Sequence, residues 1–396
     1  MANTGVSKRY NLAMQRVILF VIIALLVAPS FSAKLASAQT PTAGPEPDSG
    51  AVVCAPGPYL TQPSDCLALG PSVYLTKLAR AGLLSGSPTP LPAAKPDAEL
   101  ASLPFRYFHI ITEDPVPILS APGDVTGAQL LYKGFVYVSY KERLDTGHGI
   151  YYLTQNGGWV IGRGERYQEI PAFQGLQFSA TPRNSFGWSF EDIPIMAAPG
   201  YQAPETGQRL SPFTVVQIYD TQNVGGADWN MIGIDRWVEA RKVAQVDVNT
   251  TPPDGSNNAT RWIDVNLAEQ TLAVYDSGQL IFATVIASGM EPFWTRPGLF
   301  QIQQKKETET MRDNDPSDFY YIEDVPWTMY FDGPRALHGA FWRTRFGYPQ
   351  SHGCVNLSVG DAHWIYDWAH EGDFVWVHDP TGQTPTDPAL YHGGAY

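Results

Sequence analysis

Cys354 lies in an unusual setting, the segment SHGCVNL at 351–357. A thiol there could fill a core, form half of a disulfide, bind a metal ion or act as a nucleophile. Two histidines could act on it, His352 two residues before it and His338 sixteen residues before it. Imidazole accepts protons near neutral pH, and Gly353 lets the backbone approach a ligand closely. These residue types point to a cysteine nucleophile with a histidine base.

A cysteine nucleophile needs a base, a group that orients the base, and donors for the developing oxyanion. A free thiol has a pKa of about 8.5, so little of it is thiolate at neutral pH. An imidazole within hydrogen-bond reach can remove that proton and later deliver one to a leaving amine. Backbone N–H groups around Gly353 and Cys354 could hold the oxyanion, an effect of roughly 3–4 kcal/mol per donor.

Three other roles for Cys354 are disfavoured or stay open. A disulfide is disfavoured because the other two cysteines, Cys54 and Cys66, lie close together and could pair in an oxidising compartment. A metal site is disfavoured because no CxxC pair or HExxH helix accompanies His338, His352 and Cys354. A buried structural thiol stays open, since free cysteines are often buried as small hydrophobic residues.

The elements that must position these residues are mainly strands. The chain contains 36 Gly and 33 Pro, which favour turns and short strands. From residue 261 apolar and polar residues alternate, and the DSGQ turn at 276–279 separates two apolar runs, as in a β-hairpin. A strand and a return loop between His338 and Cys354 would bring the imidazole opposite the thiol.

One helix is predicted after the cysteine. Residues 358–372 begin with Ser358 as a cap and end at Gly372, and apolar residues between them share a face. The run FVWV at 374–377 is then predicted to return as a strand.

The segment ALHGAFWRTRFGYPQSHGCVNLS at 336–358 resembles the signature of L,D-transpeptidase (YkuD-type) catalytic domains. That signature is a histidine, some fifteen residues, then Ser or Thr, His, Gly, Cys, a hydrophobic residue and Asn. The upstream runs QTLAVYDSGQLIFATVIASG, TRPGLFQI and VPWTMYF are similar to the strands that precede it in the family. The resemblance covers about 261–378 and implies a β-rich catalytic domain with a short helix after the cysteine.

The resemblance also implies residue roles. Cys354 would be the nucleophile, and His338 the proton acceptor and donor. The carbonyl of Gly339 would orient the imidazole. The oxyanion environment would come from His352, Gly353 and Cys354, while Ser351 and Asn356 would brace the loop or serve only as its scaffold.

The reaction implied by the resemblance is ping-pong acyl transfer on peptidoglycan stem peptides. A thioester would form and a neighbouring stem's amine would resolve it, giving a 3→3 cross-link, with no metal or cofactor. With water as acceptor the same site would be an L,D-carboxypeptidase, and the sequence does not separate the two. A third reading is a wall-binding scaffold in which the catalytic domain is incidental.

Two further features near the site have open roles. The aromatic residues Tyr330, Phe341, Trp342 and Tyr348 could line a pocket or belong to the core. The acidic segment 307–324 could cover the site as a lid that favours an ammonium acceptor, or be a solvated connector.

An internal repeat precedes the catalytic region. DPVPILSAPGDVTGAQL at 114–130 matches EDIPIMAAPGYQAPETGQRL at 191–210, and a Trp-Val strand closes each copy. The pair resembles two bacterial SH3-like barrels, expected at 105–172 and 173–250. Such modules bind cell-wall peptides or glycans, or act as spacers. The sequence predicts a mainly β chain of two small SH3-like β-barrels and an L,D-transpeptidase domain.

The N-terminus reads as an export signal. Basic residues precede the apolar run 17–28, and Ala36-Ser37-Ala38 offers a cleavage site, so 1–38 is predicted to be removed. The protein would then be extracytoplasmic and wall-associated, with membrane contact only if the segment stays uncleaved. A Pro-rich linker with a short helix is expected at 39–104 and a tail at 379–396. The net charge of −13 disfavours nucleic acid as a partner, and the oligomeric state is left open.

Overall fold

The computed structural model describes residues 91–391, apart from gaps at 112–114, 125, 127–128, 131–134, 163–165, 168–172 and 314–318. Several sequence-based expectations lie outside these residues: the signal segment, the Cys54–Cys66 pair, most of the linker with its short helix, and the last residues of the tail. In the part of the chain that the structure describes, no helix is long and apolar enough to cross a membrane.

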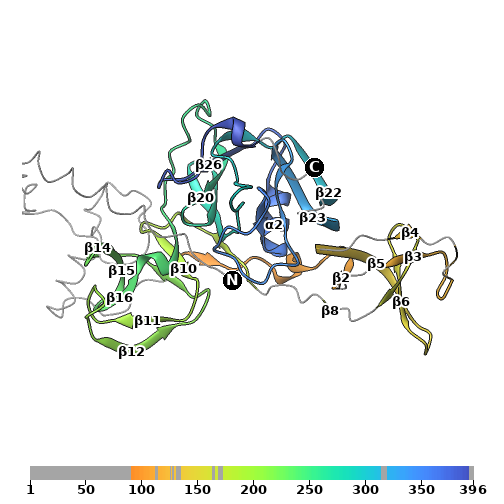
Figure 1. Ribbon diagram of the computed structural model, residues 1–396. Coiled ribbons are helices and arrows are strands. Elements are labelled where there is room, and N and C mark those ends of the chain that lie inside the picture. The colour runs from red at the N-terminus through yellow and green to blue at the C-terminus, as the bar shows by residue number, and fades with distance from the viewer. Residues whose placement is uncertain are drawn as a thin grey trace, which may run out of the picture. The chain divides into compact units, whose positions relative to one another are not determined.

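The hairpin predicted after residue 260 lies in a seven-stranded sheet (Figure 1). Ser277 and Gly278 form its turn, and both have positive φ (50° and 76°), as twisted strands joined by two residues require. The sheet order is β1 (Ala93–Ala94), β9 (Leu176–Phe178), β20 (Gln279–Val285), β19 (Thr271–Asp276), β18 (Arg261–Asn266), β26 (Phe374–His378) and β21 (Gly298–Gln301).

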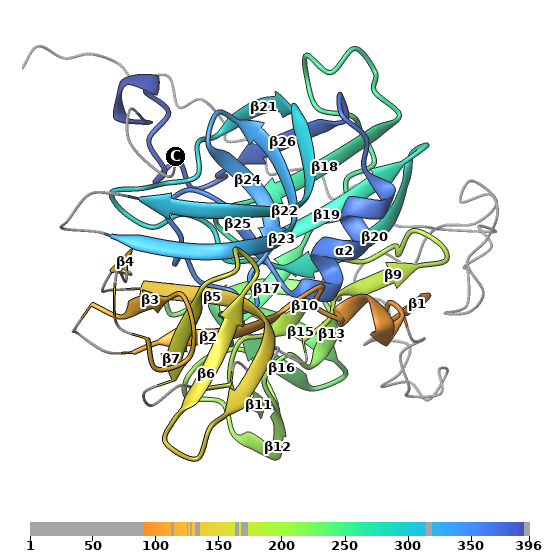
Figure 2. The same cartoon turned by 90° about the vertical axis from the view of Figure 1, so that its right-hand side faces the viewer.

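A second sheet carries the segments that form the candidate site (Figure 2). Its continuous path is β25 (Val355–Leu357), β24 (Arg335–Gly339), β23 (Tyr320–Asp332), β5 (Phe135–Asp145), β6 (Ile150–Thr154), β7 (Trp159–Gly162), β3 (Pro117–Leu119) and β4 (Gln129–Leu130). Three more strands are attached to this path: β22 (Gln304–Asp313) on β23, β2 (Arg106–Ile110) on β5, and β8 (Arg166–Tyr167) on β2.

Two smaller sheets contain the second copy of the repeat. One has the order β13 (Val215–Gln217), β10 (Phe186–Ser189) and β17 (Val243–Val246). The other has the order β12 (Glu205–Leu210), β11 (Ile193–Met196), β16 (Arg236–Glu239), β15 (Ala227–Gly233) and β14 (Asp220–Val224). Short 3-10 helices complete the described chain: η2 (Ala98–Ala101), η3 (Ala240–Lys242) and, in the tail, η4 (Pro388–Tyr391).

The internal repeat is visible in the strand pairing, but the described residues form no closed barrel. The order β4-β3-β7-β6-β5 in the first copy matches β12-β11-β16-β15-β14 in the second, with Leu119 opposite Trp159 and Met196 opposite Trp237. The expectation of two closed SH3-like barrels is therefore not confirmed. In the first copy, one edge of β5 pairs over Phe135–Tyr137 with β23, which lies outside 105–172, so these backbone groups are unavailable to close a barrel.

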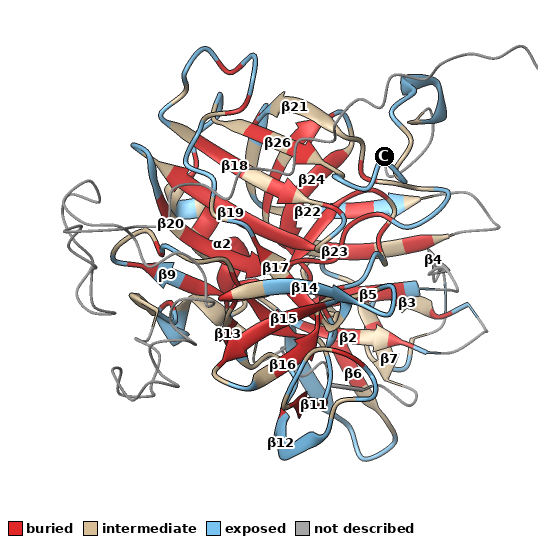
Figure 3. Cartoon of the chain, turned by 90° about the vertical axis from the view of Figure 1, so that its left-hand side faces the viewer, coloured by how far each residue is buried: buried red, intermediate tan, exposed pale blue. Residues whose placement is uncertain are grey.

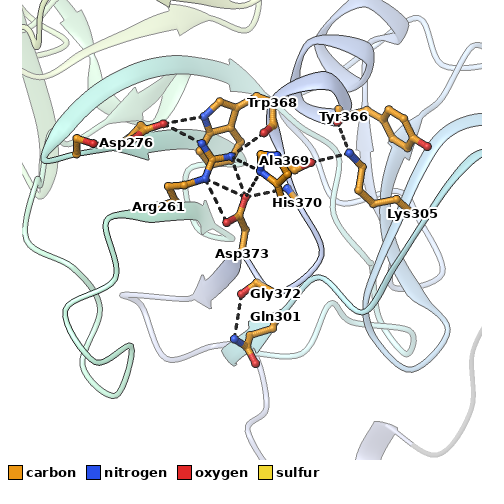
Figure 4. A network of polar contacts seen from close by, with 11 residues as sticks. Arg261, Asp276, Gln301, Lys305, Tyr366, Trp368, Ala369, His370, Gly372 and Asp373 are labelled. Atoms are coloured by element: carbon orange, nitrogen blue, oxygen red, sulfur yellow. Dashed lines mark hydrogen bonds and ion pairs between the residues drawn. The ribbon is translucent and has the colours of Figure 1, made fainter.

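The predicted helix is α2 (Val359–Trp368), the one α-helix in the described part of the chain. The Ser358 hydroxyl accepts a hydrogen bond from the Asp361 N–H, which confirms the predicted cap. The helix ends at Trp368 rather than at Gly372, because Ala369 has an extended backbone. The Lys305 ammonium donates to the carbonyls of Tyr366 and Ala369, so these C-terminal carbonyl groups have partners (Figure 4).

The largest apolar core joins both large sheets with α2. Its fully buried members include Ile263 of β18, Val355 of β25 and Ile365 of α2. Figure 3 shows that the central strands of both sheets are mostly buried. In this core β24 and β25, which belong to the second sheet, pack against α2 and the first sheet. The candidate site is formed at these two strands.

Arg261, the first residue of β18, links this strand to the C-terminal end of α2 (Figure 4). Its guanidinium pairs with Asp276 at 2.9 Å and Asp373 at 3.0 Å, and it donates to the Trp368 carbonyl at 2.6 Å. The same group lies 4.0 Å from the centre of the Trp368 ring. Arg261 thus joins three elements through charge, hydrogen bonding and ring stacking.

We expect Arg261→Ala to lower the free energy of unfolding by about 2 kcal/mol. Removal of the partly buried guanidinium leaves two carboxylates and a carbonyl without their hydrogen-bond partner. Urea denaturation measures the change. The matched control is Arg209→Ala, since Arg209 pairs with Asp192 and the two side chains are 50% and 57% exposed. A change of less than about 0.5 kcal/mol is expected there, and equal losses in the two variants would contradict the prediction.

Candidate active site

Cys354 and His338 come from neighbouring strands of the second sheet. β24 and β25 are parallel, with Leu337 opposite Val355 and His338 opposite Asn356. Cys354 directly precedes β25, so it lies two residues before the asparagine that faces the histidine. The tertiary structure therefore brings the two predicted residues to adjacent strands.

In this structure the thiol and the imidazole each bond to a third group. Cys354 Sγ donates to the carbonyl oxygen of Pro334 at 3.9 Å. His338 Nε2 contacts Asn356 Nδ2 at 2.9 Å. The imidazole must therefore release the Asn356 amide before it can take a proton from the thiol.

His338 is buried and is oriented from both sides. Its Nδ1 lies 3.3 Å from the carbonyl oxygen of Gly339, the group that the family resemblance implied would orient the imidazole. Its ring stacks on Trp342 with the ring centres 5.7 Å apart. Burial lowers the pKa of His338 to about 4, and the charge of Arg343 acts in the same direction. The imidazole is therefore neutral at pH 7.

Cys354 is also buried, with 5% of its surface exposed. Burial raises the pKa of its thiol, while the Ala336 backbone and the charge of Arg335 act to lower it. Because the thiol pKa is raised and the imidazole pKa is lowered, the resting pair is uncharged rather than a thiolate–imidazolium ion pair.

The loop before β25 is held by its own hydrogen bonds. Ser351 Oγ donates to the Cys354 carbonyl at 2.5 Å and accepts from the Gly353 N–H at 3.2 Å. Thr295 Oγ1 donates to the Gly353 carbonyl at 2.9 Å. Gly353 has φ of 111°, which disfavours other residues, and a Cβ there would lie 3.0 Å from Arg335 Nε. These contacts fix the backbone that carries the thiol.

His352 and Asn356 have different surroundings. The His352 ring lies between aromatic rings, 4.9 Å from Phe293 and 5.1 Å from Tyr320. Asn356 is buried, and its Oδ1 accepts from Arg343 Nε at 2.5 Å while its amide nitrogen faces His338. Asn356 therefore contacts the predicted base directly.

The four aromatic residues singled out in the sequence do not form one wall. Trp342 stacks on His338, and Phe341 is fully buried in the apolar cluster that contains Cys354. Tyr330 packs against that cluster, and burial raises its pKa with a contribution from Cys354. Tyr348 lies elsewhere, against Phe190 and Arg345.

Two tyrosines from the first copy of the repeat also reach the Cys354 cluster. Tyr107 of β2 stacks on Phe341 with ring centres 3.8 Å apart, and Tyr137 of β5 meets the same ring edge-on at 5.6 Å. The Tyr107 hydroxyl donates to the Asp324 carbonyl at 2.6 Å. Sequence reasoning missed both residues, because they lie some 200 positions before Cys354 and no local motif marks them.

The acidic segment 307–324 forms most of a hairpin rather than a solvated connector. β22 and β23 pair over its described part, and Met311, Tyr320 and Ile322 pack in the cluster that contains Cys354. Glu323 of β23 is buried and accepts from the Ser139 backbone N–H at 3.0 Å. The hairpin is thus attached to β5 by a buried carboxylate as well as by strand pairing.

Sequence reasoning also missed Arg343. Its guanidinium contacts Asn356 and Gln350, and burial lowers its pKa to about 10. In the sequence WRTR, nothing distinguishes it from Arg345, which is exposed. Among the described residues, no group of three or more His, Cys, Asp or Glu could hold a metal ion.

Comparison with known proteins identifies the region around this site. Residues 260–377 match the family model YkuD, described as the L,D-transpeptidase catalytic domain. YciB of Bacillus subtilis (strain 168), a protein named as a candidate L,D-transpeptidase, is 21% identical over 165 residues, which are 34% of this chain and 76% of that protein.

Two solved structures are also similar to parts of the chain. The L,D-transpeptidase (Yku) from Stackebrandtia nassauensis is 28% identical with a TM-score of 0.26, over 32% of this chain and 58% of that one. The catalytic domain of the E. faecium L,D-transpeptidase is 25% identical with a TM-score of 0.28, over 30% of this chain and 96% of that one.

Proposed function

We propose, from the premise that residues 260–377 are an L,D-transpeptidase catalytic domain, that this protein forms 3→3 cross-links between peptidoglycan stem peptides. The observation that carries the proposal is the placement of His338 on β24 and of Cys354 directly before the adjacent parallel strand β25, inside the matched region. Cys354 is the nucleophile of this reaction and His338 its base.

The first half-reaction forms a thioester. A bound stem peptide displaces the Asn356 amide from His338 Nε2, and that nitrogen takes the proton of the Cys354 thiol. The sulfur attacks the carbonyl carbon between an L-centre and a D-centre. The tetrahedral intermediate then breaks its C–N bond, and the leaving amine takes the proton from His338. The products are a thioester and a free D-residue.

The second half-reaction resolves the thioester. An amine of a neighbouring stem attacks the thioester carbonyl, His338 accepts its proton, and the C–S bond breaks to return that proton to the thiol. A new amide bond is formed and no cofactor is consumed. We assign the Cys354 N–H to the oxyanion, because the Gly353 N–H already donates to Ser351.

The uncharged resting pair suits this sequence of steps. Cys354 belongs to an apolar cluster and His338 is 1% exposed, so separated charges on the two groups are costly. Proton transfer then accompanies attack on the substrate, and the thiol is not a standing thiolate exposed to oxidation. We also propose that the chain is exported through its N-terminal segment and acts on stem peptides in the cell wall.

A product assay tests the proposal. The purified protein is incubated with disaccharide-tetrapeptide, and products are separated by mass. Cross-linked dimer is the expected product, whereas tripeptide without dimer would show that water is the acceptor and that the protein is an L,D-carboxypeptidase. Absence of both products, with the wild-type protein folded, would overturn the proposal.

A carbapenem is expected to acylate Cys354 with one equivalent of drug. The activated sulfur opens a strained lactam by the same attack that it makes on a peptide carbonyl, and the acyl group stays on the enzyme. Intact-protein mass spectrometry measures the adduct, and the Cys354→Ala variant is the control that should stay unmodified. An unchanged wild-type mass after prolonged incubation would contradict the prediction.

A further inference from the structure

A buried chain of hydrogen bonds runs from an arginine to the proposed base. Arg343 Nε lies 2.5 Å from Asn356 Oδ1, Asn356 Nδ2 lies 2.9 Å from His338 Nε2, and His338 Nδ1 lies 3.3 Å from the Gly339 carbonyl. Asn356 and His338 are 2% and 1% exposed. Water therefore has little access to these side chains and cannot readily replace a hydrogen-bond partner that a mutation removes.

The chemistry of the groups allows one arrangement of the protons. A guanidinium only donates, so the Asn356 oxygen must face Arg343 and its NH₂ must face the imidazole. That NH₂ also only donates, so His338 Nε2 must be the unprotonated acceptor. The Gly339 carbonyl only accepts, so the proton of the neutral imidazole is on Nδ1.

The reverse arrangement would leave groups of the same kind facing each other. With the amide turned over, its NH₂ would point at the guanidinium and its oxygen would require a proton on Nε2. Unpaired polar groups in a buried site cost about 1–3 kcal/mol each. The charge of Arg343 therefore determines, through Asn356, which ring nitrogen of His338 carries the proton.

We propose that Arg343 is a positioning residue that acts through Asn356 to hold His338 as the tautomer with its proton on Nδ1 and its Nε2 free of a proton. This inference rests on the proposed function, since Nε2 is the atom that must accept the thiol proton. In the other tautomer Nε2 would already carry a proton and could not act as the base.

Arg343 also contacts Gln350, and this contact determines which variants are needed. Its guanidinium also donates to the side chain and the carbonyl of Gln350, so it helps to hold the loop that begins at Ser351. Loss of Arg343 could therefore disturb the loop as well as the imidazole. A variant at Asn356 that keeps the bond to Arg343 separates the two effects.

The test reads the tautomer of His338 directly. The full chain is labelled with ¹⁵N-histidine, and long-range ¹H–¹⁵N spectra of the imidazoles are recorded at pH 7, with His338→Gln used to assign the signals. The wild type is expected to show a protonated Nδ1 and an unprotonated Nε2. Arg343→Met is expected to show a mixture of both tautomers, and Arg343→Lys, which keeps a donor-only charge, to restore the wild-type pattern.

Two further variants decide the outcome. Asn356→Asp places an acceptor-only group between Arg343 and His338, so the proton is expected to move to Nε2 while the bond to Arg343 is kept. Arg345→Met removes an exposed arginine from the same segment and should leave the spectrum unchanged. If Arg343→Met does not fold, Asn356→Asp still tests the proposal.

The rate of acylation by a carbapenem supplies a second readout. It should fall roughly 10- to 100-fold in Arg343→Met, within the contribution expected of a general base, with recovery in Arg343→Lys. A protonated Nε2 in the wild type, or the wild-type tautomer in folded Arg343→Met, would overturn the inference; if Arg343→Met is unfolded, the wild-type tautomer in Asn356→Asp would overturn it. The spectra need no substrate, so a wild type that makes no cross-links would remove the proposed function and leave the tautomer result standing.

Discussion

Cys354→Ala is expected to reduce the formation of cross-linked dimer by about 10⁴-fold or more, because the proposed reaction carries the acyl group on the Cys354 sulfur. His338→Gln is expected to cost about 10²–10⁴-fold, since the thiol then attacks without a base. The double variant should be no worse than Cys354→Ala alone, because the two residues act as one unit.

Mass-spectrometric quantification of dimer over time measures these losses. Arg345→Met is the matched control, because Arg345 is exposed and contacts Tyr348 rather than the site. Circular dichroism should show that each variant is folded. Dimer formation by Cys354→Ala at a rate near that of the wild type would show that the cysteine is not the nucleophile.

Asp361→Ala is expected to lower the free energy of unfolding at pH 5 by about 2–4 kcal/mol. Asp361 lies fully buried in the first turn of α2 and accepts from the Gly175 N–H at 2.9 Å and from Thr284 Oγ1 at 2.6 Å. The carboxyl group thus joins α2 to β20 and to the segment before β9. Alanine would leave the buried Gly175 N–H without this acceptor and Thr284 Oγ1 with only the Val285 carbonyl at 3.4 Å.

Asp361→Asn is the matched variant that tests the charge. Burial raises the pKa of Asp361 to about 6 from 3.8. A raised pKa in the folded state means that its contribution is present below pH 3.8 and is lost as the pH rises through 6. The difference amounts to about 3 kcal/mol. The amide side chain of the variant carries no charge, so Asp361→Asn should match the wild type near pH 3.5 and be more stable at pH 8.

Urea denaturation of wild type and variant across pH 3.5–8 measures this difference. The comparison is needed because His338 acts in the opposite direction, since its pKa is lowered to about 4 and its contribution is lost as the pH falls from 6.5. Subtracting the two curves isolates Asp361. A difference between wild type and Asp361→Asn that does not change with pH would contradict the assignment.

The sequence was sufficient to predict turns and helix caps, because these depend on residues that are neighbours in the chain. The Ser277-Gly278 turn requires positive φ at both residues, and the hairpin between β19 and β20 follows. Ser358 could be predicted as a cap because a hydroxyl at that position satisfies a free N–H of the first turn. The SHGC segment and its preceding histidine could be found in the same way, as could the repeat, whose two copies have one strand order.

Partners that are distant in sequence could not be predicted. The sequence suggested closed barrels at 105–172 and 173–250, yet β5 pairs through its first residues with β23, nearly 200 positions later. A strand's pairing edge carries backbone groups that are the same in every residue, so the side-chain pattern does not say which strand will use it. For the same reason Tyr107 and Tyr137 could not be connected to the cluster around Cys354.

The order of residues along the chain, with the family resemblance, was enough to predict the chemical groups of the candidate site: a thiol, an imidazole, a glycine that permits the loop, and a carbonyl beside the imidazole. How these groups are protonated and held follows from the folded arrangement alone. The pKa shifts of Cys354 and His338 come mainly from burial by residues of several strands, and the position of the imidazole proton depends on an arginine reached through an asparagine. Such effects depend on distances in space, which a one-dimensional pattern does not contain.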